Sequence, residues 1–166
     1  MLADWNQEAA QSAARELEVH KTLTVRCDVS DEAQVEAMAK QTVATFGRLD
    51  AAYNNADVQN VLAETADTTR EDYDRVMAVN LRAVWSCMKF ELQQMRRQGS
   101  SAIVNTPQGR SIGVHQERGS RICNARGIRI NAVCLAARGK SRDFRAALSR
   151  IICKRILQSA RTVREC

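Results

Sequence analysis

The stretch Leu49-Asp50-Ala51-Ala52-Tyr53-Asn54-Asn55-Ala56-Asp57 decides how the rest of the chain is interpreted. A short apolar run that gives way to two asparagines is typical of a buried strand whose carboxyl end opens onto a ligand crevice in an open α/β sheet. The signal is weak by itself. It gains weight because the segments on both sides alternate between strand and helix patterns up to residue 106.

The segments before this strand predict a helix, a strand and a second helix. Residues 5–18 are rich in strong helix formers, and residues 22–26 form a short β-branched run. Ser30 is the expected N-cap of a helix that ends at Gly47. Such alternation implies parallel strands joined by right-handed crossovers, with helices covering the sheet.

The segments after it continue the pattern. A polar loop over 58–68 precedes a long helix predicted from Thr69 to about Gln98, with Asp72 completing a capping box and Gly99 ending the helix. Asn80 falls on the apolar stripe of this helix, where an isolated asparagine is usually a satisfied core polar group. Residues 101–106 and 127–134 predict two more strands.

The charge of the chain changes sign at Pro107. Residues 1–106 carry 11 Lys and Arg against 16 Asp and Glu, whereas residues 107–166 carry 14 against 3. We therefore expect a first domain over 1–135, with an irregular loop at 107–124, and a basic tail over 136–166 with the spacing of an amphipathic helix.

Six cysteines and two histidines show no paired spacing, which argues against a zinc site and favours reduced thiols. No segment is long and apolar enough to span a bilayer, and the first residues lack the pattern of a signal peptide. These features predict a cytoplasmic protein without a metal centre.

Seven segments, taken in order, resemble the classical short-chain dehydrogenase/reductase family. They are Leu-Ala-Asp-Trp, Cys-Asp-Val-Ser-Asp, Phe-Gly-Arg-Leu-Asp, Asn-Asn-Ala-Asp, Val-Asn-Leu-Arg-Ala-Val, Ala-Ile-Val-Asn-Thr and Arg-Gly-Ile-Arg-Ile-Asn-Ala-Val-Cys. The resemblance implies an incomplete Rossmann-like parallel sheet that binds NAD(P) and moves a hydride to or from an alcohol or ketone. The family's first strand and glycine-rich loop have no counterpart, and the resemblance becomes degenerate after residue 106.

The resemblance also implies a set of cofactor-binding residues. Asp4 would bind the adenosine ribose and repel a 2′-phosphate, which favours NAD over NADP, although it could equally cap the first helix. Asp28 and Val29 would contact the adenine; the alternative is a helix-entry turn with Asp28 exposed. Asn55 and Ala56 match the turn that runs beside the cofactor.

Departures from the family pattern imply impaired NAD binding and catalysis. Asp57 replaces a glycine and would face the pyrophosphate with a negative charge. Asn80 matches the catalytic asparagine, but Gln108 stands where the catalytic serine is expected. No Tyr-x-x-x-Lys occurs in the sequence, so the family's proton transfer lacks its carrier. The expected function is that of an oxidoreductase by descent, with a small alcohol or ketone as substrate if it is active.

Two other functions remain open on the sequence alone. The chain could be a non-catalytic module that forms homodimers through the helix at 69–98. Residues 138–166, with nine Lys and Arg against two acidic residues, could instead bind nucleic acid or an anionic membrane. A charge run of this kind is more often a solvated face.

Overall fold

The computed structural model describes residues 1–17, 22–59, 63–106 and 128–132. The predicted irregular loop at 107–124 and the basic tail at 136–166 lie outside these residues. Strands and helices alternate as the sequence predicts, in the order β1 (Leu2–Asp4), α1 (Gln7–Glu16), β2 (Thr24–Arg26), α2 (Glu32–Phe46), β3 (Ala51–Asn54), the 3₁₀ turn η1 (Thr65–Asp67), α3 (Arg70–Met77), the π-helical segment η2 (Ala78–Arg82), α4 (Ala83–Gln98), β4 (Ser101–Asn105) and β5 (Ile128–Ala132).

Side-chain caps begin the first two helices. Asn6 and Asp31 each accept a hydrogen bond from a backbone N–H in the first turn of α1 and α2. The expectation that Ser30 caps α2 was wrong. The Ser30 backbone N–H and hydroxyl both donate to Asp28 Oδ1, at 2.9 and 2.7 Å, so the turn closes on Asp28 and the cap falls on the next residue.

The long helix predicted from Thr69 is present, with a change of winding in its middle. Thr69 accepts a hydrogen bond from the Asp72 backbone N–H at 3.1 Å, which confirms it as the N-cap, and donates its hydroxyl to the Asp72 carboxylate at 2.9 Å. The π-helical segment η2 then separates α3 from α4. Gly47 and Gly99 end α2 and α4 in the left-handed region, at φ of 80° and 85°, as predicted.

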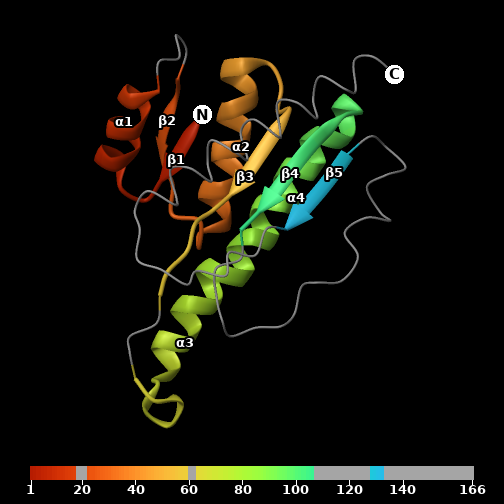
Figure 1. The fold of residues 1–166 in the computed structure, drawn as a ribbon. Helices are drawn as coiled ribbons and strands as arrows, with labels where there is room; N and C mark the ends of the chain where they lie inside the picture. The colour runs from red at the N-terminus through yellow and green to blue at the C-terminus, as the bar shows by residue number, and fades with distance from the viewer. Residues whose placement is uncertain (18–21, 60–62, 107–127, 133–166) are drawn as a thin grey trace.

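All described strand pairs are parallel, but they form two sheets rather than one (Figure 1). One sheet pairs β1 with β2, in the register Ala3 with Val25. The other has the order β3-β4-β5, in which Ala52 pairs with Ile103 and Ile103 with Ile130. No described strand joins β1 to β3.

Helix α4 packs in the centre of the molecule. Met95 lies fully buried with Ile103 and Ile128, which ties the helix to the three-stranded sheet. Nearer the start of α4, Cys87 packs with Cys27 and Val35, which ties the same helix to α2 and to the end of β2. The two sheets thus share one helix as their common support.

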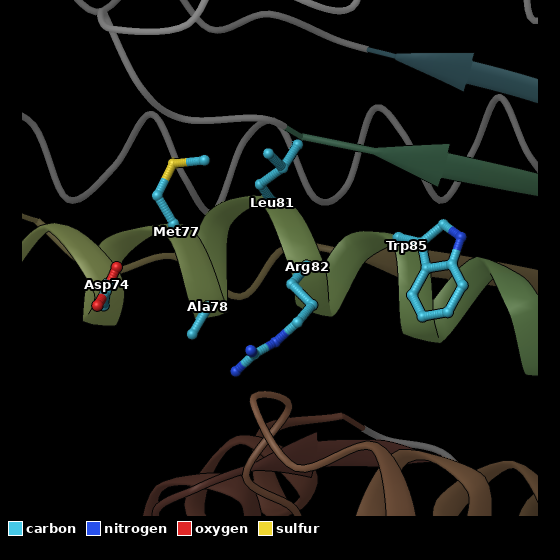
Figure 2. A pocket seen from close by; sticks show the side chains of 6 residues that line it. All are labelled: Asp74, Met77, Ala78, Leu81, Arg82 and Trp85. Atoms are coloured by element: carbon cyan, nitrogen blue, oxygen red, sulfur yellow. The ribbon is translucent and has the colours of Figure 1, made fainter.

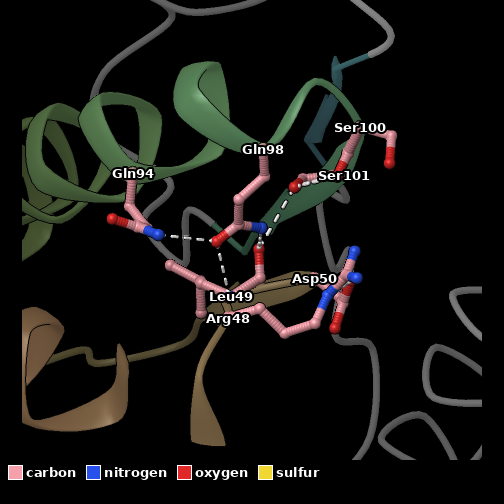
Figure 3. A network of polar contacts seen from close by, with 7 residues as sticks. All are labelled: Arg48, Leu49, Asp50, Gln94, Gln98, Ser100 and Ser101. Atoms are coloured by element: carbon pink, nitrogen blue, oxygen red, sulfur yellow. Dashed lines mark hydrogen bonds and ion pairs between the residues drawn. The ribbon is translucent and has the colours of Figure 1, made fainter. Parts of the chain in front are cut away.

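A polar network fixes the chain where it enters β3 (Figure 3). The Leu49 N–H donates to Gln98 Oε1 and the Gln98 side-chain amide donates to the Leu49 carbonyl, both at 2.9 Å. Ser101 Oγ donates to the same carbonyl at 3.1 Å. The last turn of α4 and the start of β4 therefore hold the entry of β3 in place.

Candidate functional site

A cleft of about 720 Å³ lies between the two sheets. Its walls come from β1 and β3, and helices α2 and α4 contribute further residues to its lining. At the carboxyl ends of the strands it is lined by all five residues that the sequence predicts as cofactor-binding: Asp4, Asp28, Val29, Asn55 and Ala56. The structure thus brings together residues that are far apart in the sequence.

The two predicted carboxylates each close a local turn. Asp4 Oδ1 accepts a hydrogen bond from the Asn6 backbone N–H at 2.9 Å, just before α1, while Asn6 is the helix cap. Asp28 Oδ1 accepts both hydrogen bonds from Ser30, and the Asp28 N–H donates to Gln34 Oε1 at 2.9 Å. Both carboxylates are exposed, and these bonds use one oxygen of each.

The other predicted cofactor residues differ in burial. Val29 is partly buried and packs against the cluster of Cys27, Val35 and Cys87. Asn55 is exposed, and its Oδ1 accepts hydrogen bonds from the Tyr53 hydroxyl at 3.0 Å and from Thr106 Oγ1 at 2.7 Å. Ala56 follows it, also exposed. Asn55 therefore links the ends of β3 and β4.

Asn80, the predicted catalytic asparagine, lies in η2 behind the cleft wall. Its Oδ1 accepts a hydrogen bond from the Val58 N–H and its Nδ2 donates to the Val58 carbonyl, both at 2.9 Å. Val58 itself lines the cleft. In this structure the Asn80 amide is a satisfied, partly buried polar group that holds the loop after β3, while its catalytic role stays a prediction.

Sequence reasoning missed a buried polar cluster at the same end of the sheet. Asn54 Nδ2 donates to Glu91 Oε2 at 3.1 Å and to Asn105 Oδ1 at 2.9 Å. Glu91 is only 6% exposed, and burial raises its pKa to about 7 against the opposing effect of the Asn54 hydrogen bond. Its spacing of four residues from Cys87 and Met95 was the available signal, because that spacing places it on a buried helix face.

The cleft is rich in acidic groups. Asp4, Asp28, Asp57 and Glu91 contribute to its lining, whereas Arg75 is the one Lys or Arg among its described lining residues. This excess of acidic residues favours ligand groups that donate hydrogen bonds, such as ribose hydroxyls or amino groups, and disfavours the negative charge of a pyrophosphate. Within the described ranges, no cluster of His, Cys, Asp and Glu could hold a metal ion.

A second hollow, of about 660 Å³, lies on the outer surface of the α3–η2–α4 helix. Figure 2 shows Met77 and Leu81 on one side of the helix and Arg82 on the other, with Trp85 one turn along. Trp85 is 54% exposed, and Lys89 Nζ lies 5.2 Å from the centre of its ring. This hollow contains none of the predicted site residues.

Comparison with known proteins bears on the cleft. Residues 1–119 match the family model described as enoyl-(acyl carrier protein) reductase, so the match continues beyond residue 106. The chain is 43% identical over 86 residues to levodione reductase of Leifsonia aquatica, an alignment that covers 52% of this chain and 32% of that protein.

Two solved structures resemble the described fold. NAD⁺-bound xylitol dehydrogenase matches with a TM-score of 0.60 and 33% identity, covering 63% of this chain and 41% of the other. ElxO with NADP bound matches with a TM-score of 0.57 and 26% identity, covering 63% and 43%. The chain therefore spans less than half the length of each of these proteins. Among the described residues no helix is long and apolar enough to cross a membrane.

Proposed function

Because the chain belongs to the short-chain dehydrogenase/reductase family, we propose that its cleft is the adenosine end of a nicotinamide dinucleotide site, inherited from an alcohol or ketone oxidoreductase. The supporting observation is that all five residues expected to bind the cofactor line one cleft. A bound nicotinamide cofactor supplies the hydride donor or acceptor. The residues of this chain would bind and orient its adenosine part.

The donor set fits that part of the cofactor. The exposed carboxylate of Asp4 suits the ribose hydroxyls and disfavours a 2′-phosphate, which makes NAD the proposed cofactor over NADP. Asp28 offers an acceptor for the adenine amino group, and Val29 offers an apolar surface for the ring. The related structures contain NAD⁺ in one case and NADP in the other, so the choice of NAD rests on Asp4.

The pyrophosphate part fits poorly, so we propose that NAD binding and catalysis are impaired. Asp57 adds an acidic group to those of Asp4 and Asp28 in the cleft, and repulsion of a pyrophosphate follows. The sequence also has Gln108 at the expected serine position and no Tyr-x-x-x-Lys. The substrate class of an active form would be a small alcohol or ketone.

A nucleotide titration tests this proposal. We expect ADP-ribose to bind weakly, NADH to bind no more tightly than ADP-ribose, and Asp28→Ala to weaken both several-fold. Asp67→Ala, an exposed acid on η1, is the matched control and should change neither. Micromolar NADH binding would contradict the proposed impairment, and equal ADP-ribose affinity of Asp28→Ala and the parent chain would contradict the site.

The α3–η2–α4 surface favours a second role, homodimer formation. Tyr73 and Trp85 are 52% and 54% exposed, and Trp85 lines the hollow together with Met77 and Leu81. Large exposed aromatic residues beside an apolar hollow are typical of interfaces. Sedimentation should give a dimer that Trp85→Glu dissociates. A monomer at all concentrations would exclude this role.

A further inference from the structure

The carboxyl end of the two-stranded sheet carries an acidic and a basic residue side by side. Asp4 and Arg26 are the last residues of β1 and β2, and they are partners in the parallel register. Register partners on neighbouring strands lie about 4.8 Å apart and present their side chains on the same face of the sheet. Both residues are exposed. A ligand that reaches the Asp4 carboxylate therefore also comes within reach of the Arg26 guanidinium.

The Arg26 side chain is held by one of its three nitrogens. Arg26 Nε donates a hydrogen bond to the Trp5 backbone carbonyl at 3.3 Å, in the turn that follows Asp4 and precedes α1. A guanidinium carries five N–H donors. Within the described ranges, neither Nη nitrogen of Arg26 has a hydrogen-bond acceptor or an ion-pair partner. Four charged donors therefore remain for a ligand.

Arg26 lies next to the cleft. It is not itself a lining residue, but its register partner Asp4, its hydrogen-bond partner Trp5 and the residue after it, Cys27, all line the cleft. Arg26 therefore brings a positive charge to the end of the cleft where Asp4 is proposed to bind the ribose.

The arginine that does line the cleft is already engaged. Arg75 Nη2 lies 3.5 Å from an Asp72 carboxylate oxygen and donates to the Gln59 carbonyl at 3.3 Å. These contacts hold Arg75 at α3 and at the loop after β3, whereas Asp4 ends β1. Of these two arginines, Arg26 is the one paired in register with Asp4.

We propose that Arg26 is a binding residue for a phosphate on the adenosine ribose, and that Asp4 alone keeps this chain from accepting NADP. This inference rests on the proposed function, because it concerns the ribose end of the same site. A phosphate on the ribose 2′-oxygen would meet the Asp4 carboxylate, which repels it, and the Arg26 Nη groups, which match two phosphate oxygens in a bidentate geometry. Removing the Asp4 charge therefore turns this end of the cleft from rejecting a 2′-phosphate to binding it.

Two ligands that differ only in this phosphate provide the test. ADP-ribose and 2′-phospho-ADP-ribose are titrated into the full chain by isothermal titration calorimetry, and the thermal transition of each variant is recorded as a check of folding. Asp4→Asn removes the charge and keeps an oxygen for the Asn6 N–H. We expect this variant to bind 2′-phospho-ADP-ribose at least about tenfold more tightly than the parent chain does.

A second substitution tests the arginine. In the Asp4→Asn chain, Arg26→Gln should lower the affinity for 2′-phospho-ADP-ribose about tenfold relative to the affinity for ADP-ribose. Arg97→Gln, which removes an exposed charge from the last turn of α4, is the matched control and should leave this ratio unchanged. Equal losses for the two arginine variants would overturn the inference, because overall charge rather than Arg26 would then attract the phosphate.

The outcomes separate this inference from the proposed function. Asp28→Ala should weaken both ligands to the same extent, because the adenine is common to them. If ADP-ribose binds but Asp4→Asn leaves the preference between the two ligands unchanged, the inference about Asp4 and Arg26 is wrong while the adenosine site stands. If neither ligand binds to any of these chains, the adenosine site itself is excluded, and the role of Arg26 is excluded with it.

Discussion

Asn80 and Val58 are joined by two hydrogen bonds of 2.9 Å, with the asparagine amide bonding both the N–H and the carbonyl of the valine. The pair connects the π-helical segment η2 to the loop that leaves β3. Gln98 makes the same double contact with Leu49 where the chain enters that strand. Two side-chain amides therefore fix β3 from both ends, and with it one wall of the cleft.

Replacing Asn80 should loosen the exit of β3. Asn80→Ala leaves two backbone groups of Val58 without their partners, and we expect it to lower the free energy of unfolding by about 1–3 kcal/mol. Urea denaturation followed by circular dichroism measures this change. Gln93→Ala, an exposed position on α4, is the control and should stay within about 0.5 kcal/mol of the parent chain. Equal stability of the two variants would show that the Val58 contact contributes nothing.

Glu91 should make the protein less stable as the pH rises. Its folded-state pKa of about 7 lies above the ordinary value of 4.5, because burial penalises the charged carboxylate. Below pH 4.5 the Glu91 carboxyl is protonated in both the folded and the unfolded chain, so it does not lower the stability of the fold. Between pH 4.5 and 7 the unfolded chain ionises first, so up to about 3 kcal/mol of stability is lost over this window.

Glu91→Gln should remove that dependence, because it keeps an acceptor for Asn54 and cannot ionise. Melting temperatures at pH 5 and pH 8 measure the effect for the variant, the parent chain and the control Glu71→Gln, an exposed acid on α3. We expect the variant to be more stable than the parent chain at pH 8 and similar to it at pH 5. An identical pH profile for Glu91→Gln and Glu71→Gln would exclude a buried carboxylate.

Local signals made most of the elements predictable. The alternation of strands and helices, the start of the long helix at Thr69 and the glycines after α2 and α4 each depend on residues close together in the sequence, and each is confirmed. The cap of α2 was assigned one residue early, because Ser30 and Asp31 are both good caps. Only the hydrogen bonds decide between them: Ser30 donates to Asp28, whereas Asp31 accepts from the Ala33 N–H.

Burial and long-range pairing were harder to predict. The burial of Glu91 was not predicted, because a charged side chain is not expected on the buried face of a helix. Asn54 of β3 donates a hydrogen bond to it there. The shared cleft around Asp4, Asp28 and Asn55 depends on contacts between strands distant in the sequence. Their positions were predictable only through the family resemblance, and their roles in binding remain predictions.

Gly47 should resist replacement by residues with a Cβ atom. Its φ of 80° lies in the left-handed region, while nothing lies within 4 Å of the position that a Cβ would occupy. The cost of Gly47→Ala is therefore conformational rather than steric, and we expect a loss of about 1 kcal/mol in unfolding free energy. Gly47→Asn should lose less, because asparagine tolerates this conformation. A smaller loss for alanine than for asparagine would contradict this explanation.

Cys87 should be nearly inert in the folded protein. Burial raises its pKa to about 12, with smaller contributions from Glu91 and Cys27, and the side chain is only 5% exposed. Because the thiolate is the reactive form, alkylation by iodoacetamide at pH 8 should be slow at Cys87, and also at buried Cys27, whose pKa is raised by burial and by Asp28 and Asp31. Mass spectrometry of the corresponding peptides measures the rate at each cysteine, and the same chain in urea supplies the unprotected rate. Alkylation of native Cys87 as fast as in urea would mean that the contact between α2 and α4 opens readily, and that the cleft it supports is not a stable site.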